Sequence, residues 1–173
     1  MGKKILNLPN MLTISRIVLS PLFFILLLNN KMPAGLIVFV IVALTDLADG
    51  WVARRTRQKS TFGEIIDPMA DKLMVLLAVI ALIIRFDFPV YGLLIFSRDV
   101  VSLLGSAVSY LKKKAVWKPN IFGKLTTAFQ VITIICFIIK INFKSVILLF
   151  TIGLSVLAAI TYFIALVKLS KKK

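Results

Sequence analysis

Residues 46–71 read DLADGWVARRTRQKSTFGEIIDPMAD, and they gather most of the acidic groups of a chain that is otherwise apolar and basic. Five of the seven acidic residues lie in this stretch. Asp46 and Asp49 are three residues apart, and Asp67 and Asp71 are four residues apart. Residues at i+3 and i+4 share one face of an α-helix. The spacing therefore predicts two helices, each of which presents two carboxylates on one face.

The two carboxylate pairs are expected at the same depth in neighbouring helices. Asp46 lies eight residues before Arg54, and Asp71 lies eight residues after Gly63. Eight residues correspond to about 12 Å of helix in each case. A short basic loop joins the two helices, which makes them antiparallel neighbours. All four carboxylates are therefore predicted to converge near one end of this helix pair.

The remainder of the chain is apolar enough for an integral membrane protein. Its 173 residues are 60% hydrophobic, with a mean hydropathy of +0.98, whereas soluble domains are about 45–50% apolar. A membrane-spanning helix needs about 20 mostly apolar residues. We therefore predict one all-α integral membrane domain over residues 1–173, possessing no separate soluble domain. The six predicted spans are 11–28, 34–54, 64–85, 89–111, 121–140 and 145–167, preceded by a short interfacial helix at 3–9.

Basic side chains are distributed unevenly over the two sides of this six-span layout. Fourteen of them lie on the side that carries both termini, and four lie on the other side, namely Lys31, Arg85, Lys140 and Lys144. The positive-inside rule then places both termini in the cytoplasm, together with the loops at 55–63 and 112–120. The carboxylates are expected near the same cytoplasmic face.

Four carboxylates in one region of a membrane require positive charge beside them. One ionised side chain at the centre of a bilayer costs about 2.5–3.5 kcal/mol on the most lenient scale. Lys72 and Arg54 supply part of the compensation, and one or two divalent cations bridged by the carboxylates are the simplest source of the rest. The chain has no histidine, and its single cysteine, Cys136, lies in an apolar run. Oxygen ligands favour Mg²⁺, Mn²⁺ or Ca²⁺. The alternative is that some aspartates are interfacial and pair with arginines.

Small and cationic residues between the aspartates fit a nucleotide site. Gly50 and Ala53 leave room for a ligand to approach the helix, and Arg54 can reach a phosphate. Gly63 precedes a helix whose N-terminus favours anions. For each glycine, the alternative is a role in helix packing or in a turn.

These residues resemble the signature of the CDP-alcohol phosphatidyltransferase family. The family pattern DxxDGxxAR, followed by GxxxDxxxD, is matched at every fixed position between residues 46 and 71. The stretch NLPNMLTISR at residues 7–16 resembles the start of bacterial phosphatidylglycerophosphate synthases and of the related eukaryotic-type cardiolipin synthases. The resemblance extends to the six-span layout.

The resemblance implies an enzyme that transfers the phosphatidyl group of CDP-diacylglycerol to an alcohol and releases CMP. In this family four aspartates hold two divalent cations, Mg²⁺ or Mn²⁺, on the CDP pyrophosphate, and the last aspartate is the general base. Family members are usually homodimers, and we expect this one in a bacterial plasma membrane. The metal ligands would be Asp46, Asp49, Asp67 and Asp71, with Asp71 as the base. The CDP-binding residues would be Asp46, Asp49, Gly50, Ala53, Arg54, Gly63 and Asp67.

The acceptor alcohol is expected to contact charged residues elsewhere in the predicted spans. Arg98 lies inside span 89–111, Lys124 begins span 121–140, and Arg16 lies in the first span. Charged residues within a membrane are functional candidates by default. The alternative for Arg98 is an internal pair with Asp99 or another carboxylate, and the alternative for Lys124 is an interfacial position.

A phosphate-bearing acceptor suits such a basic region. Glycerol 3-phosphate, which gives phosphatidylglycerol phosphate, is the leading expectation, and phosphatidylglycerol, which gives cardiolipin, is the alternative. A third hypothesis, from another functional class, is a cation or proton transporter that uses the carboxylates. A transporter does not require Gly50 and Arg54 beside them, and these two residues therefore favour the enzyme.

Overall fold

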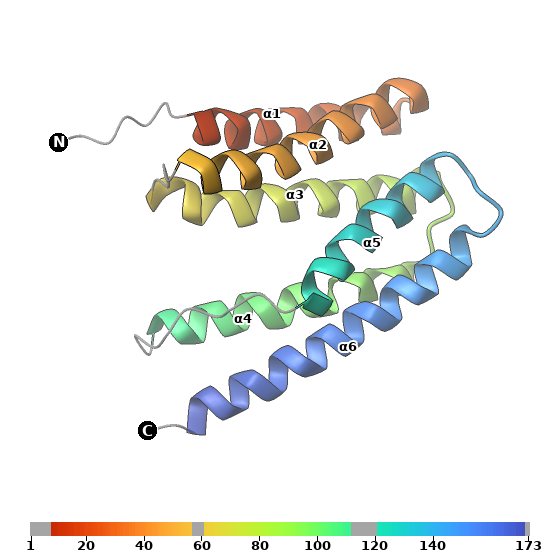
Figure 1. Cartoon of the computed structure of the whole chain (residues 1–173). Coiled ribbons are helices and arrows are strands. Elements are labelled where there is room, and N and C mark those ends of the chain that lie inside the picture. Colours follow the sequence, from red (N-terminus) through yellow and green to blue (C-terminus); the bar gives the residue numbers. More distant parts are fainter. Residues whose placement is uncertain (1–7, 57–60, 112–120, 172–173) are drawn as a thin grey trace. The chain divides into compact units, whose positions relative to one another are not determined.

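The structure, a computed structural model, describes residues 8–56, 61–111 and 121–171, and within these helices the side chains of 8–13, 46–56, 61–71, 106–111 and 168–171 lie outside the description. The described residues form six α-helices and one 3₁₀ helix, with no strand among them, so the all-α prediction is confirmed for this part of the chain. The elements are α1 (Leu8–Leu28), α2 (Met32–Thr56), α3 (Thr61–Arg85), η1 (Val90–Phe96), α4 (Ser97–Leu111), α5 (Ile121–Ile138) and α6 (Lys144–Lys171) (Figure 1).

Each predicted apolar segment coincides with helix, and most boundaries agree within a few residues. The segment predicted at 89–111 differs in kind, because it begins as the 3₁₀ helix η1 and becomes α-helical only at Ser97. The interfacial helix expected at 3–9 falls mostly on residues 1–7, outside the described residues, as do 57–60 and 112–120 of the predicted loops.

The chain divides into two compact units, residues 1–88 and 89–173. In the N-terminal unit, α1 packs against both α2 and α3. The rings of Phe23 and Phe39 meet in its interior with centroids 5.2 Å apart. A Cβ at Gly35 would lie 2.9 Å from Leu27 Cδ2. The absence of a side chain at this position therefore allows α1 and α2 to approach closely.

In the C-terminal unit, α6 packs against η1, α4 and α5. Ile95, Ile134, Phe137 and Leu148 are fully or almost fully buried. Thr133 of α5 and Thr151 of α6 share a hydrogen bond of 2.8 Å between their hydroxyl groups. This unit therefore combines an apolar core with polar contacts between its helices.

Two turns, between α1 and α2 and between α5 and α6, have the same geometry. Asn30 and Lys140 have positive φ angles of 57° and 56°. In each turn the next residue bonds back across the helix end: Lys31 N donates to Leu26 O at 2.9 Å, and Ile141 N donates to Cys136 O at 3.1 Å. This is the Schellman arrangement, which satisfies the last carbonyls of a helix.

Large apolar side chains are exposed on the described helices and in the turn before α6. Val90, Ile121 and Phe143 are 68–70% exposed, and many other large apolar residues are exposed as well. Two stretches, Ile121–Ile138 and Lys144–Val167, are long and apolar enough to cross a membrane. These features are consistent with a membrane protein, and the crossing of all six predicted spans stays a prediction.

Candidate functional site

The residues of the acidic signature lie on two helices of the N-terminal unit. The signature residues on α2 are Asp46, Asp49, Gly50, Ala53 and Arg54, and those on α3 are Gly63, Asp67 and Asp71. Both helices are continuous through these positions, so the spacing that predicts one face for each aspartate pair applies. Their side chains lie outside the described residues. The convergence of the four carboxylates, the metal site and the CDP contacts therefore stay predictions.

The C-terminal unit contains a polar cluster where η1 meets α4. At this junction the backbone carbonyl of the buried Ile95 accepts two side-chain hydrogen bonds, from Gln130 Nε2 at 2.8 Å and from Ser155 Oγ at 2.7 Å. An unpaired backbone carbonyl in an apolar interior is costly, and a change of helix type in a membrane protein is tolerated where side chains satisfy the backbone. Gln130 of α5 and Ser155 of α6 fulfil that need.

Ser155 also contacts the first residues of α4. Its hydroxyl lies 3.0 Å from Ser97 Oγ and accepts a 3.2 Å hydrogen bond from the backbone N–H of Arg98. Together with its bond to Ile95, these contacts fix the start of α4 against α6. The position of the Arg98 backbone is thus set by a neighbouring helix.

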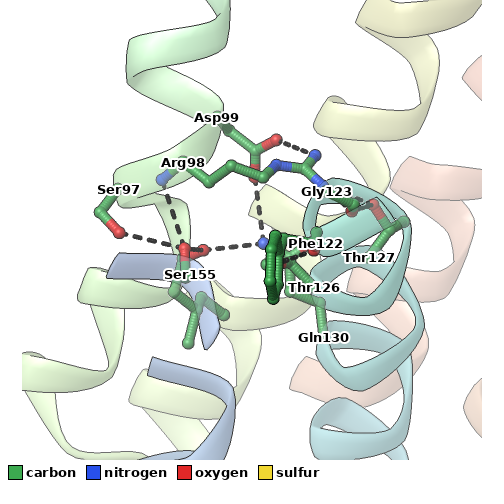
Figure 2. Close-up of polar contacts among 10 residues, drawn as sticks. Ser97, Arg98, Asp99, Phe122, Gly123, Thr126, Thr127, Gln130 and Ser155 are labelled. Atoms are coloured by element: carbon green, nitrogen blue, oxygen red, sulfur yellow. Dashed lines mark hydrogen bonds and ion pairs between the residues drawn. The ribbon is translucent and has the colours of Figure 1, made fainter. Parts of the chain in front are cut away.

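Arg98 extends from α4 to α5, as Figure 2 shows. Its Nη1 donates to the carbonyl oxygen of Gly123 and to Thr127 Oγ1, the latter at 2.9 Å. Its Nη2 donates to Asp99 Oδ1 at 2.5 Å, and the Arg98 side chain is 14% exposed. The internal Arg98–Asp99 pair, which sequence analysis offers as the alternative to acceptor binding, is therefore present.

Asp99 is held on both of its carboxylate oxygens. Oδ1 faces Arg98, and Oδ2 accepts a hydrogen bond from Gln130 Nε2 at 3.0 Å (Figure 2). Asp99 lies in the first turn of α4, where the backbone N–H groups favour an anion. The carboxylate is 9% exposed. A buried charge of this kind is tolerated because it is paired and hydrogen-bonded.

The ion pair leaves part of the guanidinium group available. A guanidinium has five N–H bonds, and three are used by Gly123, Thr127 and Asp99. The Nε–H of Arg98 is buried and has no acceptor among the described residues. Two N–H bonds of Arg98, one on Nε and one on Nη2, therefore have no acceptor among the described residues, and arginine uses such paired N–H bonds for phosphate.

Gly123 allows three helices to meet beside Arg98. A Cβ at this position would lie 2.5 Å from Tyr162 Oη and 3.5 Å from Arg98 Nη1. Tyr162 belongs to α6 and is 6% exposed. Any larger residue would therefore displace the tyrosine hydroxyl that fills this space.

The three predicted acceptor-binding residues fall in both units. Arg98 lies in the polar cluster, and Lys124 is exposed on α5, directly after Gly123. Arg98, Asp99 and Lys124 together carry a net charge of +1, which favours an anionic ligand. Arg16 lies on α1 of the N-terminal unit and is 1% exposed.

The sequence patterns assign no role to four members or neighbours of the cluster, Thr127, Gln130, Ser155 and Tyr162. A signal for two of them is present in the sequence, because Gln130 and Ser155 are polar residues inside segments predicted to be membrane-spanning. Such residues usually face a partner inside the bundle. Their partner at Ile95 is a backbone atom, and no pattern of side chains reveals it.

Comparison with known proteins identifies similar sequences. A family model described as CDP-alcohol phosphatidyltransferase matches residues 6–166. The CDP-diacylglycerol–glycerol-3-phosphate 3-phosphatidyltransferase of Aquifex aeolicus is 33% identical over 128 residues, which cover 72% of this chain and 71% of the relative. A Bacillus subtilis protein of the same name is 33% identical over 144 residues, 74% of each chain. The human protein named cardiolipin synthase (CMP-forming) is 35% identical over 120 residues, which cover 68% of this chain and 39% of the relative.

Proposed function

Since the chain belongs to the CDP-alcohol phosphatidyltransferase family, we propose that it transfers the phosphatidyl group of CDP-diacylglycerol to glycerol 3-phosphate and releases CMP. The observation that carries this proposal is the match of the family signature at residues 46–71, within a family match over residues 6–166. The two relatives that share a third of its residues over most of their length carry the name of this reaction.

The donor half of the site is assigned to α2 and α3. The donor atoms offered there are the carboxylates of Asp46, Asp49, Asp67 and Asp71, and the whole chain has no histidine. This set fits two hard divalent cations, Mg²⁺ or Mn²⁺, which when bound would neutralise the pyrophosphate and the charge that develops on CMP. Gly50, Ala53, Arg54 and Gly63 would contact the CDP group.

Asp71 would act as the general base. It would accept the proton of the acceptor hydroxyl while the hydroxyl oxygen forms a bond to the β-phosphorus of CDP-diacylglycerol. The bond from that phosphorus to the bridging oxygen breaks, and CMP leaves with the electron pair. General-base catalysis contributes about 10²–10⁴-fold to such a step.

The acceptor half is assigned to Arg98 and Lys124, with Arg16 as a further candidate. Support for Arg98 comes from the two N–H bonds for which the described residues offer no acceptor, because a phosphate accepts two such bonds from one guanidinium. Lys124 adds positive charge on the neighbouring helix. A phosphate monoester such as glycerol 3-phosphate matches this charge.

The second candidate function is a CMP-forming cardiolipin synthase, in which phosphatidylglycerol is the acceptor. The observation that favours it is the 35% identity to the human protein of that name. The two functions share the donor, the metal site and the base, and they differ only in the acceptor.

We also propose six membrane spans, with both termini and the active site on the cytoplasmic side of a bacterial plasma membrane. The excess of basic residues on the side of the termini supports this orientation. A homodimer is the expected assembly, on the basis of the family resemblance.

A product assay tests the proposal. Purified protein in detergent would receive CDP-diacylglycerol and Mn²⁺ with glycerol 3-phosphate, phosphatidylglycerol or inositol phosphate in parallel reactions. The lipid products would be separated and identified by mass spectrometry. Phosphatidylglycerol phosphate from the first reaction is expected. Cardiolipin from the second reaction, with no product from the first, would identify the protein as a cardiolipin synthase instead. The absence of CMP release with every acceptor would refute both functions.

A further inference from the structure

Gln130 connects η1 to Asp99, the ion-pair partner of Arg98. It lies in α5, and its side chain is almost fully buried, with 2% exposed. Its amide nitrogen donates to Ile95 O at 2.8 Å and to Asp99 Oδ2 at 3.0 Å. The first bond fixes the amide on the backbone of η1. The second bond, drawn in Figure 2, fixes the orientation of the Asp99 carboxylate.

We propose that Gln130 is a positioning residue for the acceptor: it restricts Asp99 to one hydrogen bond with Arg98, so that the guanidinium keeps two N–H bonds for an anionic headgroup. This inference rests on the proposed function, in which Arg98 binds the acceptor. Gln130 itself does not contact the acceptor in this account. It acts through Asp99.

The physical reason is the strong preference of carboxylate and guanidinium groups for paired hydrogen bonds. A free carboxylate beside an arginine frequently forms two parallel bonds with it. In this structure one carboxylate oxygen faces Gln130, and only the other faces Arg98. Without the Gln130 amide, the carboxylate is free to rotate and to occupy a second N–H bond of Arg98. The guanidinium would then have fewer donors for a phosphate, and its charge would be more fully neutralised.

The effect should be confined to the acceptor. Gln130, Asp99 and Arg98 all lie in the C-terminal unit, whereas the signature assigned to CDP-diacylglycerol lies on α2 and α3 of the N-terminal unit. Loss of the Gln130 amide should therefore raise the KM for the acceptor and leave the KM for CDP-diacylglycerol unchanged. A purely structural role would lower thermal stability without separating the two constants.

The test is Gln130→Met, which keeps the side-chain volume and removes the amide. The acceptor KM, the donor KM, kcat and the thermal midpoint would be measured on the full chain in detergent, with whichever of glycerol 3-phosphate and phosphatidylglycerol the unmodified protein uses. The acceptor KM is expected to rise about tenfold, the size of one lost hydrogen bond to a charged group. The donor KM should stay within twofold.

Thr133→Val is the matched control. Thr133 is one turn further along α5, is fully buried, and bonds to Thr151 of α6. Its loss should lower the thermal midpoint and leave the acceptor KM unchanged. If Gln130→Met lowers the midpoint no more than Thr133→Val but raises the acceptor KM, packing is excluded as the cause.

A double-mutant cycle with Asp99→Asn tests the route of the effect. If Gln130 acts through the Asp99 charge, Gln130→Met should raise the acceptor KM less than twofold when Asp99→Asn is already present. Equal effects of Gln130→Met in both backgrounds would overturn the proposal. If Gln130→Met does not fold, Gln130→Asn replaces it in the test. Its amide lies on a side chain one methylene shorter and should not reach Asp99, so the same changes in the two KM values are expected.

Arg98→Lys separates this inference from the proposed function. If Arg98→Lys raises the acceptor KM and the Gln130 variants do not, the positioning role is overturned and the acceptor site stands. If Arg98→Lys leaves the acceptor KM unchanged, Arg98 does not bind the acceptor, and both assignments fail.

Discussion

The described parts of the two units differ in how many polar side chains they bury. Among the residues whose side chains are described, the N-terminal unit buries two polar side chains, Arg16 and Ser20. The described part of the C-terminal unit buries six, namely Asp99, Thr126, Gln130, Thr133, Thr151 and Ser155. Yet the N-terminal unit carries the sequence signature that identifies the family. One unit therefore carries a signature that can be recognised in the sequence, and the other carries a polar cluster whose contacts appear only in the structure.

The difference follows from how far apart the interacting residues are in the sequence. The signature aspartates are three or four residues apart on two helices, so helical periodicity alone predicts that each pair shares one helix face. The cluster around Arg98 joins Ile95 to Gln130 and to Ser155, which are 35 and 60 residues further along the chain. Contacts of this kind depend on how whole helices pack.

The largest expected effect is in the N-terminal unit. Asp71→Asn should lower kcat for CMP release by about 10²–10⁴-fold, because the change would remove the proposed general base, while CDP-diacylglycerol should still bind. Asp87→Asn is the control, since Asp87 is an exposed acid in the turn before η1 with a φ of 52°, which asparagine tolerates. An Asp71→Asn variant with more than a tenth of the original kcat would exclude this residue as the base.

The next largest effect is in the C-terminal unit and should appear in a different constant. Arg98→Ala should raise the acceptor KM by about 10–100-fold, the value of a lost charge-assisted hydrogen bond, with the donor KM unchanged. Arg85→Ala, which removes an exposed arginine at the end of α3, should change neither constant. If Arg98→Ala raised both KM values equally, the division of donor and acceptor between the two units would be wrong.

A smaller effect distinguishes two glycines of the C-terminal unit. Gly123→Ala would place a Cβ 2.5 Å from Tyr162 Oη, and overpacking of this kind lowers the free energy of unfolding by about 1–3 kcal/mol. Gly153→Ala meets nothing within 4 Å and should raise helix stability by up to about 1 kcal/mol. Thermal midpoints of the two variants in detergent should shift in opposite directions. Equal shifts would show that Tyr162 is free to move away from Gly123.

The smallest expected effect is a difference between the two turns with Schellman geometry, one of which lies in each unit. Lys140→Gly should stabilise the protein by up to about 1 kcal/mol, because lysine is strained at the positive φ that glycine adopts freely. Asn30→Gly should have a smaller effect, since asparagine tolerates this conformation better. The comparison is again of thermal midpoints, and a destabilised Lys140→Gly would indicate that the lysine side chain itself contributes to the fold.

Much of the fold is predictable from the sequence because apolar runs of about 20 residues are long and well separated. All six predicted segments contain helix in the described residues. The 3₁₀ helix at Val90–Phe96 could not be predicted, since its sequence, VYGLLIF, is as apolar as that of an α-helix. Its carbonyl at Ile95 accepts hydrogen bonds from Gln130 and Ser155, which lie on other helices far along the chain.

The candidate site around Arg98 is predictable in part: its charged residues are visible in the sequence, but their hydrogen-bond partners are not. Arg98 and Asp99 stand out as charges inside an apolar segment, and sequence analysis raises both acceptor binding and internal pairing for Arg98. The structure contains the internal pair and adds Gly123 and Thr127 as further partners of the guanidinium. Sequence spacing could not indicate that Gln130 occupies the second oxygen of Asp99.

CMP release under metal depletion tests the central claim most directly. The unmodified chain and Asp67→Asn would be treated with a chelator, given CDP-diacylglycerol and the acceptor, and titrated with Mn²⁺. We expect no CMP release by the unmodified chain after chelation and full recovery when Mn²⁺ is added. The Mn²⁺ concentration for half-maximal release should be at least about tenfold higher for Asp67→Asn, which corresponds to the loss of about 1.4 kcal/mol of metal binding. Undiminished release after chelation, or the same Mn²⁺ requirement in both proteins, would contradict a catalytic centre built from the signature aspartates.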